Sequence, residues 1–87
     1  MESENRIIIG EYPVLDMKKT GEKIKELRKD RNLSVGDICT YMGDISEQAI
    51  YKWQRGDSLP TVDNLYALSR LFQTPVDEIL VGDRDDL

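Results

Sequence analysis

The chain has 87 residues, one cysteine and no histidine, and its formal net charge is −5. These totals exclude a Cys–His or Ser–His catalytic pair, a histidine-based zinc site and an internal disulfide. No apolar run approaches the ~20 residues of a membrane span and no signal peptide is apparent, so we expect a cytoplasmic protein that is not an enzyme and needs no metal or cofactor.

The charge is distributed unevenly along the chain. Residues 1–16 carry a net charge of −3, residues 17–56 of +3, and residues 57–87 of −5. The acidic total argues against a nucleic-acid partner, because phosphate binding depends on lysine and arginine. A partner meets one face rather than the total, however, and the basic segment is where a polyanion is expected to bind.

The N-terminal residues differ in pattern from the rest of the chain. The sequence RIIIGEYPVL, residues 6–15, is rich in β-branched and aromatic residues, and Pro13 prevents a continuous helix. We expect residues 1–15 to form an extended arm that packs on the body. The alternative is a strand that pairs with the same strand of a second copy.

From residue 16 onward, apolar residues recur at helical spacing in segments that each begin with a capping residue, and this pattern predicts helices. The first helix starts after Asp16 or Thr20, between which the pattern does not decide, and runs to about Asn32. The second starts after Ser34, with Asp37 completing a capping box.

Three further helices follow. Ser46 caps the third helix and Gly56 ends it. Thr61 caps the fourth, and Thr74-Pro75 opens the fifth with proline at its first position and Asp77 completing a second capping box. Five short helices without a sheet predict a compact all-α domain over residues 16–82, followed by an acidic tail, residues 83–87. The apolar residues that repeat at helical spacing are Ile24, Leu27, Val35, Ile38, Cys39, Met42, Ala49, Ile50, Trp53, Val62, Leu65, Leu68, Phe72, Val76, Ile79 and Leu80.

The second and third helices are joined by only residues 43–45, and so short a link predicts the steep crossing of a helix-turn-helix. The segments IKELRKDRNLS, DICTYMG, AIYKWQRGDSLPTVDNLYALSRLF and PVDEILVGD follow one another in this order. Over about residues 20–81 the chain resembles the phage-repressor-like (Xre/Cro) family of helix-turn-helix domains. The resemblance implies a five-helix, lambda-repressor-like fold in which the third helix enters the DNA major groove.

The resemblance also implies roles for individual residues. It places base contacts at Glu47, Gln48, Tyr51 and Lys52, and a phosphate contact at Arg55. Lys18, Lys19 and Ser46 are further candidates for the DNA backbone, and the core of the motif comprises Ile38, Cys39, Ile50, Trp53 and Leu65.

Each candidate has an alternative reading. Gln48 can donate to and accept from adenine, or it is an ordinary solvated glutamine. Lys52 and Arg55 suit guanine or a phosphate, or they are a solvated surface pair. Tyr51 either touches the DNA or covers an edge of the core. Glu47 accepts from cytosine or acts against wrong sites by repelling phosphates. Cys39 is expected to be an inert core thiol.

The chain departs from the family pattern at several positions. Cys39 replaces the usual alanine, and Gln54 replaces a glutamate, so an Arg28–Gln54 hydrogen bond without an ion pair is expected. Val35 stands where a phosphate-binding glutamine is common. The turn between the second and third helices is also one residue longer than usual.

The resulting hypothesis is a sequence-specific, double-stranded DNA-binding transcriptional regulator. One helix reads few base pairs, so we expect a homodimer that binds two half-sites. We expect its dimer interface to consist of the fifth helix and the Ile7–Ile9 arm. The alternative is a protein-binding module, such as an antitoxin or adaptor, which the acidic total, Val35 and Glu47 favour. The two differ in salt dependence, which is steep for DNA binding.

Overall fold

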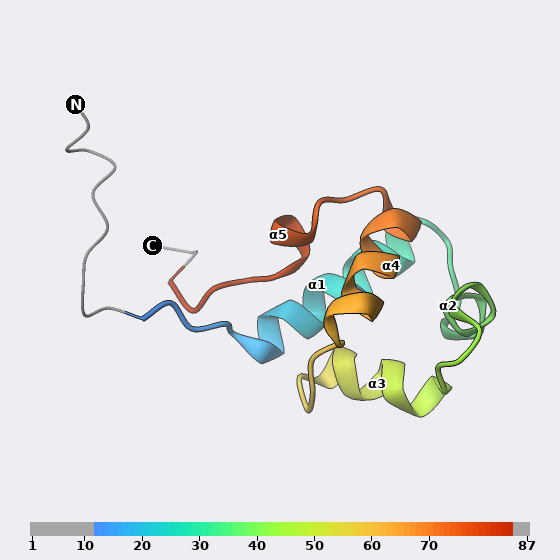
Figure 1. Cartoon of the computed structure of the whole chain (residues 1–87), viewed down its shortest axis with the longest axis horizontal. Coiled ribbons are helices and arrows are strands. Elements are labelled where there is room, and N and C mark those ends of the chain that lie inside the picture. Colours follow the sequence, from blue (N-terminus) through green and yellow to red (C-terminus); the bar gives the residue numbers. More distant parts are fainter. Residues whose placement is uncertain (1–11, 85–87) are drawn as a thin grey trace.

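The structure, a computed structural model, describes residues 12–84 and contains five helices in that part of the chain (Figure 1). They are α1 (Met17–Asp30), α2 (Val35–Met42), α3 (Glu47–Arg55), α4 (Val62–Phe72) and α5 (Val76–Ile79). Residues 12–84 contain no strand, only one isolated antiparallel β-bridge between Leu15 and Gly82. The expected all-α, five-helix fold is confirmed.

Local hydrogen bonds set where the first three helices begin. Asp16 accepts from the backbone N–H of Lys19 at 2.8 Å, which fixes the earlier of the two predicted starts of α1. Ser34 and Asp37 form the predicted capping box at the start of α2. At the start of α3, the Ser46 hydroxyl accepts from the backbone N–H of Ala49 at 3.2 Å, as predicted.

The predicted cap position of α4 is confirmed without its side-chain hydrogen bond, whereas the predicted start of α5 is wrong. Thr61 occupies the cap position of α4, but its hydroxyl donates to the Asp63 carboxylate instead of accepting a backbone N–H. This bond is the main cause of the lowered pKa of Asp63. At α5, Pro75 is the cap rather than the first helical residue, and the Thr74 hydroxyl donates to the Phe72 carbonyl at 3.1 Å.

Because the end of α4 takes the Thr74 hydroxyl, no side chain caps α5, and Asp77 completes no capping box. The helix is four residues long. A second difference from the sequence pattern is Val62, which is 85% exposed although it was predicted in the apolar stripe of α4. At about 100° per residue, Val62 lies roughly 60° to 120° around the helix from Leu65 and Leu68.

Every helix contributes to one hydrophobic core. Its buried apolar residues are Ile24, Leu27, Val35, Ile38, Ile50, Trp53, Leu68, Phe72 and Ile79. Residues packed against it but partly exposed are Leu33, Cys39, Met42, Ile45, Leu65 and Leu71. The core therefore holds the inner face of α3 and leaves its outer face free.

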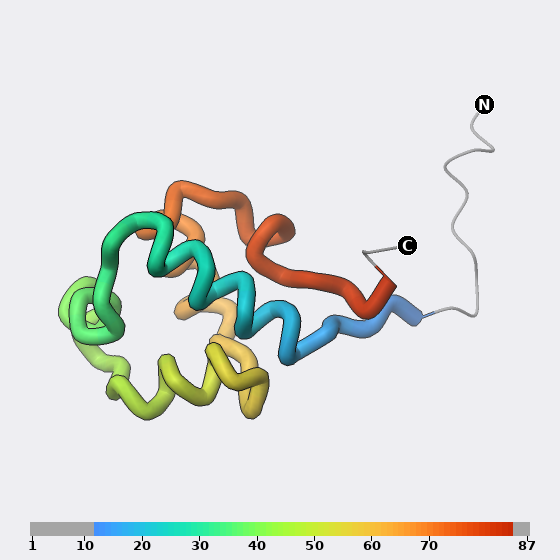
Figure 2. Tube along the Cα trace, turned by 180° about the vertical axis from the view of Figure 1, so that it is seen from behind, coloured from blue at the N-terminus to red at the C-terminus, as the bar shows by residue number. Residues whose placement is uncertain are grey.

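Helix α1 runs through the middle of the molecule, between α3 and α5 (Figures 1 and 2). The backbones of α1 and α3 approach so closely that a Cβ at Gly21 would lie 2.2 Å from the carbonyl oxygen of Trp53. Gly56, at the end of α3, lies against the start of α1, because a Cβ there would be 2.8 Å from Lys18 Cα. These glycines fix the position of α3 relative to α1.

The two ends of the described chain are hydrogen-bonded to each other. Asp16 N–H donates to the Val81 carbonyl at 2.8 Å, and Asp83 N–H donates to the Val14 carbonyl at 2.9 Å. These bonds flank the bridge between Leu15 and Gly82. The Ile7–Ile9 part of the predicted arm lies outside the described residues.

Candidate nucleic-acid interface

The candidate interface is built on α3, a nine-residue helix fixed at both ends. Ser46 caps its start, and Gly56 ends it in the left-handed conformation with φ of 82°. Ile50 and Trp53 bury the inner face. The side chains on the opposite face are consequently presented outward from a rigid support.

The outward face carries the residues that sequence analysis proposed for DNA contact. Glu47, Gln48, Tyr51, Lys52 and Arg55 are all exposed. The last four line one shallow hollow of about 330 Å³ on the surface. Tyr51 is 44% exposed and lines this hollow, which favours the DNA-contact reading over one in which it covers the core.

Arg55 has a partner that the sequence analysis did not identify. Its Nε donates to Asp57 Oδ2 at 2.9 Å, and the two side chains are 59% and 55% exposed. The backbone N–H of Asp57 in turn donates to the Lys52 carbonyl at 2.9 Å. One end of the candidate interface therefore contains an ion pair open to solvent.

The proposed backbone-contact residues come from two elements that meet. Lys18 and Lys19 are exposed in the first turn of α1, and the backbone of Lys18 abuts Gly56 at the end of α3. Ser46 lies at the other end of α3, where its hydroxyl is engaged as the helix cap. The structure thus brings Lys18 near Arg55, whereas Ser46 is a full helix length away from both.

Arg28 connects α1 to the far side of the interface helix. Its Nε donates to Gln54 Oε1 at 2.9 Å, which is the hydrogen bond expected from the sequence. A second N–H of the same guanidinium donates to the Leu33 carbonyl at 2.8 Å. Arg28 therefore ties α3 to both α1 and the link before α2.

Cys39 and Glu47 lie near each other where α2 meets the start of α3. The thiol is half-buried, and burial is the larger cause of its raised pKa, with the Glu47 carboxylate as the second. A Cβ at Gly36 would lie 3.5 Å from a carboxylate oxygen of Glu47. Glu47 therefore reaches back toward α2, and its charge stands beside the α2–α3 turn.

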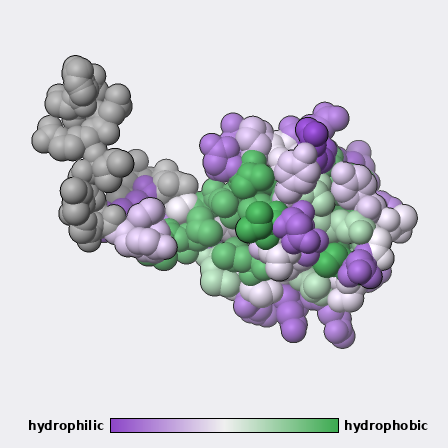
Figure 3. Space-filling model, in the orientation of Figure 1, coloured by the Kyte–Doolittle hydropathy of each residue, from purple (hydrophilic) through white to green (hydrophobic). Residues whose placement is uncertain are grey.

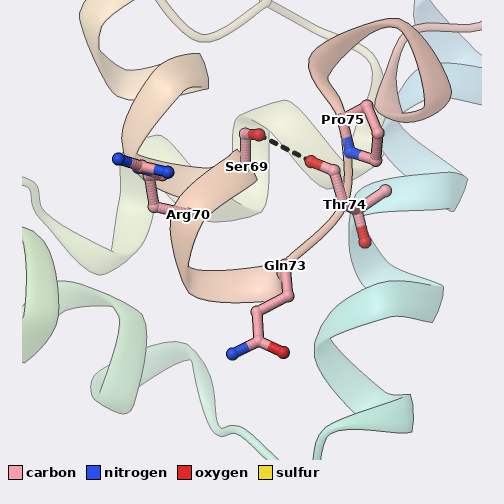
Figure 4. A pocket seen from close by; sticks show the side chains of 5 residues that line it. All are labelled: Ser69, Arg70, Gln73, Thr74 and Pro75. Carbon is pink, nitrogen blue, oxygen red and sulfur yellow. Dashed lines mark hydrogen bonds between the residues drawn. The ribbon is translucent and has the colours of Figure 1, made fainter.

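A second hollow lies where α4 ends and contains none of the residues predicted for DNA contact (Figure 4). Its lining residues are Ser69, Arg70, Gln73, Thr74 and Pro75. The Ser69 hydroxyl donates to the Thr74 carbonyl at 2.6 Å across it. The hollow lies at the point where α4 ends in the left-handed conformation, at Gln73, whose φ is 52°.

Arg31, which the sequence analysis did not single out, connects the end of α1 to the end of α4. Arg31 Nε donates to the Phe72 carbonyl at 2.6 Å, and its guanidinium lies over the Phe72 ring.

In the part of the chain that the structure describes, no helix is long and apolar enough to cross a bilayer. The same residues contain no group of three side chains that could together hold a metal ion.

The short link between α2 and α3, together with the outward polar face of α3, defines a helix-turn-helix domain. A family model described as helix-turn-helix matches residues 24–79. The chain belongs to the phage-repressor-like (Xre/Cro) helix-turn-helix family, whose fold is that of DNA-binding transcription regulators.

Two curated relatives are similar over most of this chain. The transcriptional regulator DicA of Escherichia coli K12 is 38% identical over 65 residues, which are 75% of this chain and 47% of DicA. Repressor protein C2 of Salmonella phage P22 is 35% identical over 63 residues, 72% of this chain and 29% of C2. The chain thus spans less than half the length of these relatives.

Two solved structures share the fold. The P22 c2 repressor in complex with a synthetic operator has a TM-score of 0.64 and 32% identity, covering 69% of this chain and 89% of that chain. The DNA-binding domain of BldD from S. venezulae has a TM-score of 0.64 and 28% identity, covering 74% and 94%.

Proposed function

We propose that this chain is a sequence-specific, double-stranded DNA-binding transcriptional regulator that places α3 in the major groove. The observation that carries the proposal is the common open face of Gln48, Tyr51, Lys52 and Arg55 on α3. The major groove accepts one helix of this kind. The family and its operator-bound P22 member support the same function.

In this proposal, the face of α3 divides into base-reading and phosphate-binding residues. The Gln48 amide reads adenine, Lys52 meets guanine or phosphate, and Tyr51 contacts a sugar or a thymine methyl. Arg55, at the end of α3, and Lys18, whose backbone lies against Gly56, bind the DNA backbone together with Lys19 and Ser46. Glu47 accepts from cytosine or repels wrong sites.

The active form in this proposal is a homodimer. Hydrophobic residues gather over α5 and the adjoining part of α1 (Figure 3). Leu15, just before the cap of α1, and Met17, its first residue, are 39% and 37% exposed. Burial of this surface between two copies would present two α3 helices to half-sites about one helical turn apart. Sedimentation equilibrium with a Met17→Asp variant, whose dimer should dissociate, tests this arrangement.

The test of the function is selection of bound sequences from a random pool of DNA duplexes. Gln48→Ala should lower discrimination at one base pair by roughly 1–3 kcal/mol, whereas Arg55→Ala should weaken binding to all duplexes alike. Tyr66→Ala is the matched control, because Tyr66 is exposed on α4, outside the face of α3. If no duplex is enriched, or both α3 variants bind as the unsubstituted protein does, the proposal is wrong.

The alternative is a protein-binding module on the same fold. The net charge of −5 favours it, as does the exposed pair Val62 and Tyr66 on α4, outside the candidate interface. A partner protein would co-purify and stay bound in high salt. DNA binding should instead weaken steeply with salt, in proportion to the phosphates contacted.

A further inference from the structure

The ion pair at the end of α3 places a carboxylate on the residue proposed for phosphate binding. Arg55 Nε and Asp57 Oδ2 are 2.9 Å apart, and both side chains are more than half exposed. The pair lies beside the hollow lined by Gln48, Tyr51, Lys52 and Arg55. A phosphate that approaches Arg55 therefore meets a guanidinium that already holds an anion.

The backbone of Asp57 is held in place by the end of α3. Its N–H donates to the Lys52 carbonyl at 2.9 Å, and Gly56 before it is in the left-handed conformation. The space at Gly56 is closed by Lys18 of α1. The carboxylate is thus carried by a turn that is fixed against both helices, rather than by a freely moving loop.

We propose that Asp57 is an internal competitor for the phosphate bound by Arg55 and so lowers the affinity of the protein for every DNA duplex. The inference rests on the proposed function and adds a residue that controls it. Asp57 acts through Arg55 and reads no base. It therefore sets overall affinity and salt dependence, not the preferred sequence.

The sign of the effect follows from the charges. A phosphate that binds Arg55 competes with the Asp57 carboxylate for the same positive charge, and that carboxylate remains close to the DNA backbone. An exposed ion pair is weak, so the effect is a modest factor rather than an all-or-none block. If Asp57 instead served to orient the guanidinium toward DNA, its removal would weaken binding.

The test is Asp57→Asn, measured by fluorescence anisotropy with a selected duplex and an unrelated duplex over a range of salt concentrations. We expect about two- to fivefold tighter binding to both, with an unchanged preference between them. The slope of log affinity against log salt should steepen by up to about 0.9, because Arg55 then neutralises a phosphate without competition.

Two controls separate competition from a simple change of charge. Glu26→Gln removes one negative charge from the exposed side of α1, about 140° around that helix from Gly21, and should leave affinity unchanged within about 1.5-fold. In the Arg55→Gln background, Asp57→Asn should lose most of its effect. Thermal unfolding of each variant should match that of the unsubstituted protein.

The outcomes are distinct. Weaker or unchanged binding by Asp57→Asn, or an equal gain with and without Arg55, would overturn the competitor role while leaving DNA binding intact. A failure of the unsubstituted protein to bind any selected duplex would overturn the proposed function itself.

Discussion

Gly21 is the residue that lets α1 and α3 meet backbone to backbone. A Cβ there would lie 2.2 Å from the Trp53 carbonyl oxygen and 2.6 Å from that of Gln54, and neither is a flexible group. We expect Gly21→Ala to lower the free energy of unfolding by about 2–3 kcal/mol, because the helices must separate to admit the methyl group. Urea denaturation at neutral pH measures this loss.

Gly36 provides the matched control for this substitution. It also lies in a helix, but its added Cβ would be no closer than 3.5 Å to the Glu47 side chain. Gly36→Ala should therefore be neutral or raise the free energy of unfolding by up to about 1 kcal/mol through helix propensity. Equal stability of the two variants would contradict the close approach at Gly21.

Cys39 gives a prediction that depends on pH. Burial first, and the Glu47 carboxylate second, raise the pKa of the thiol. A raised pKa leaves less thiolate at pH 8, so alkylation by iodoacetamide should be slower than for the urea-unfolded chain. Glu47→Gln should recover only part of the rate, since burial remains. An unchanged rate in Glu47→Gln would exclude the carboxylate as a contributor.

Among single residues, the local pattern predicted those whose role is local, whereas the long-range Arg28–Gln54 bond was expected only from the family resemblance. The Ser34–Asp37 and Ser46–Ala49 hydrogen bonds span three positions, so the residues themselves carry the signal. Gly21 contacts the backbone of residues more than thirty positions later, and no pattern in the sequence around it indicates that contact. Such a role depends on packing that no local pattern records.

At the scale of elements, competing local hydrogen bonds explain the differences from prediction at the starts of α4 and α5. Thr61 and Thr74 have the residue type and spacing of caps, but their hydroxyls donate to Asp63 and to the Phe72 carbonyl instead. The candidate face of α3 was predictable because one amphipathic helix specifies it. The Arg55–Asp57 pair was not, because it forms only after Gly56 turns the chain.

Substitution of Gln54 tests how much the Arg28–Gln54 hydrogen bond between α1 and α3 stabilises the fold. Gln54→Met keeps the length of the side chain but leaves Arg28 without one of its two acceptors. We expect a loss of about 1–2 kcal/mol in the free energy of unfolding, measured by chemical denaturation. The same substitution at exposed Gln48 should change it by less than about 0.5 kcal/mol. Equal effects at the two positions would mean that the Arg28 bond adds no stability.

At the scale of the whole molecule, the net charge of −5 describes no single face. The basic segment, residues 17–56, contains α1, α2 and α3, whereas the acidic excess lies in residues 1–16 and 57–87. Asp57 is the point at which the second acidic segment touches the candidate interface. If the proposed function holds, the affinity for DNA should therefore depend on local pairs more than on the total charge.

The buried side chain of Thr20 stabilises the pairing between residues 14–16 and 81–83. This fully buried hydroxyl accepts from Val81 N–H at 2.9 Å and also contacts the Val81 carbonyl, which accepts from Asp16 N–H. Thr20→Val keeps the shape but leaves the Val81 N–H unpaired. We expect it to lower the free energy of unfolding by about 1–3 kcal/mol and to speed amide hydrogen exchange at Val81 and Asp83.

Thr20→Ser is the control for this last prediction, because it keeps the hydroxyl and removes only a methyl group. It loses about 1 kcal/mol of stability through that methyl group, while exchange at Val81, relative to the global unfolding rate, stays as in the unsubstituted protein. The exchange measurement separates the two causes, since only loss of the hydroxyl opens the chain ends locally. Slow exchange at Val81 in Thr20→Val would show that the bonds of Asp16 and Asp83 hold the ends together without Thr20.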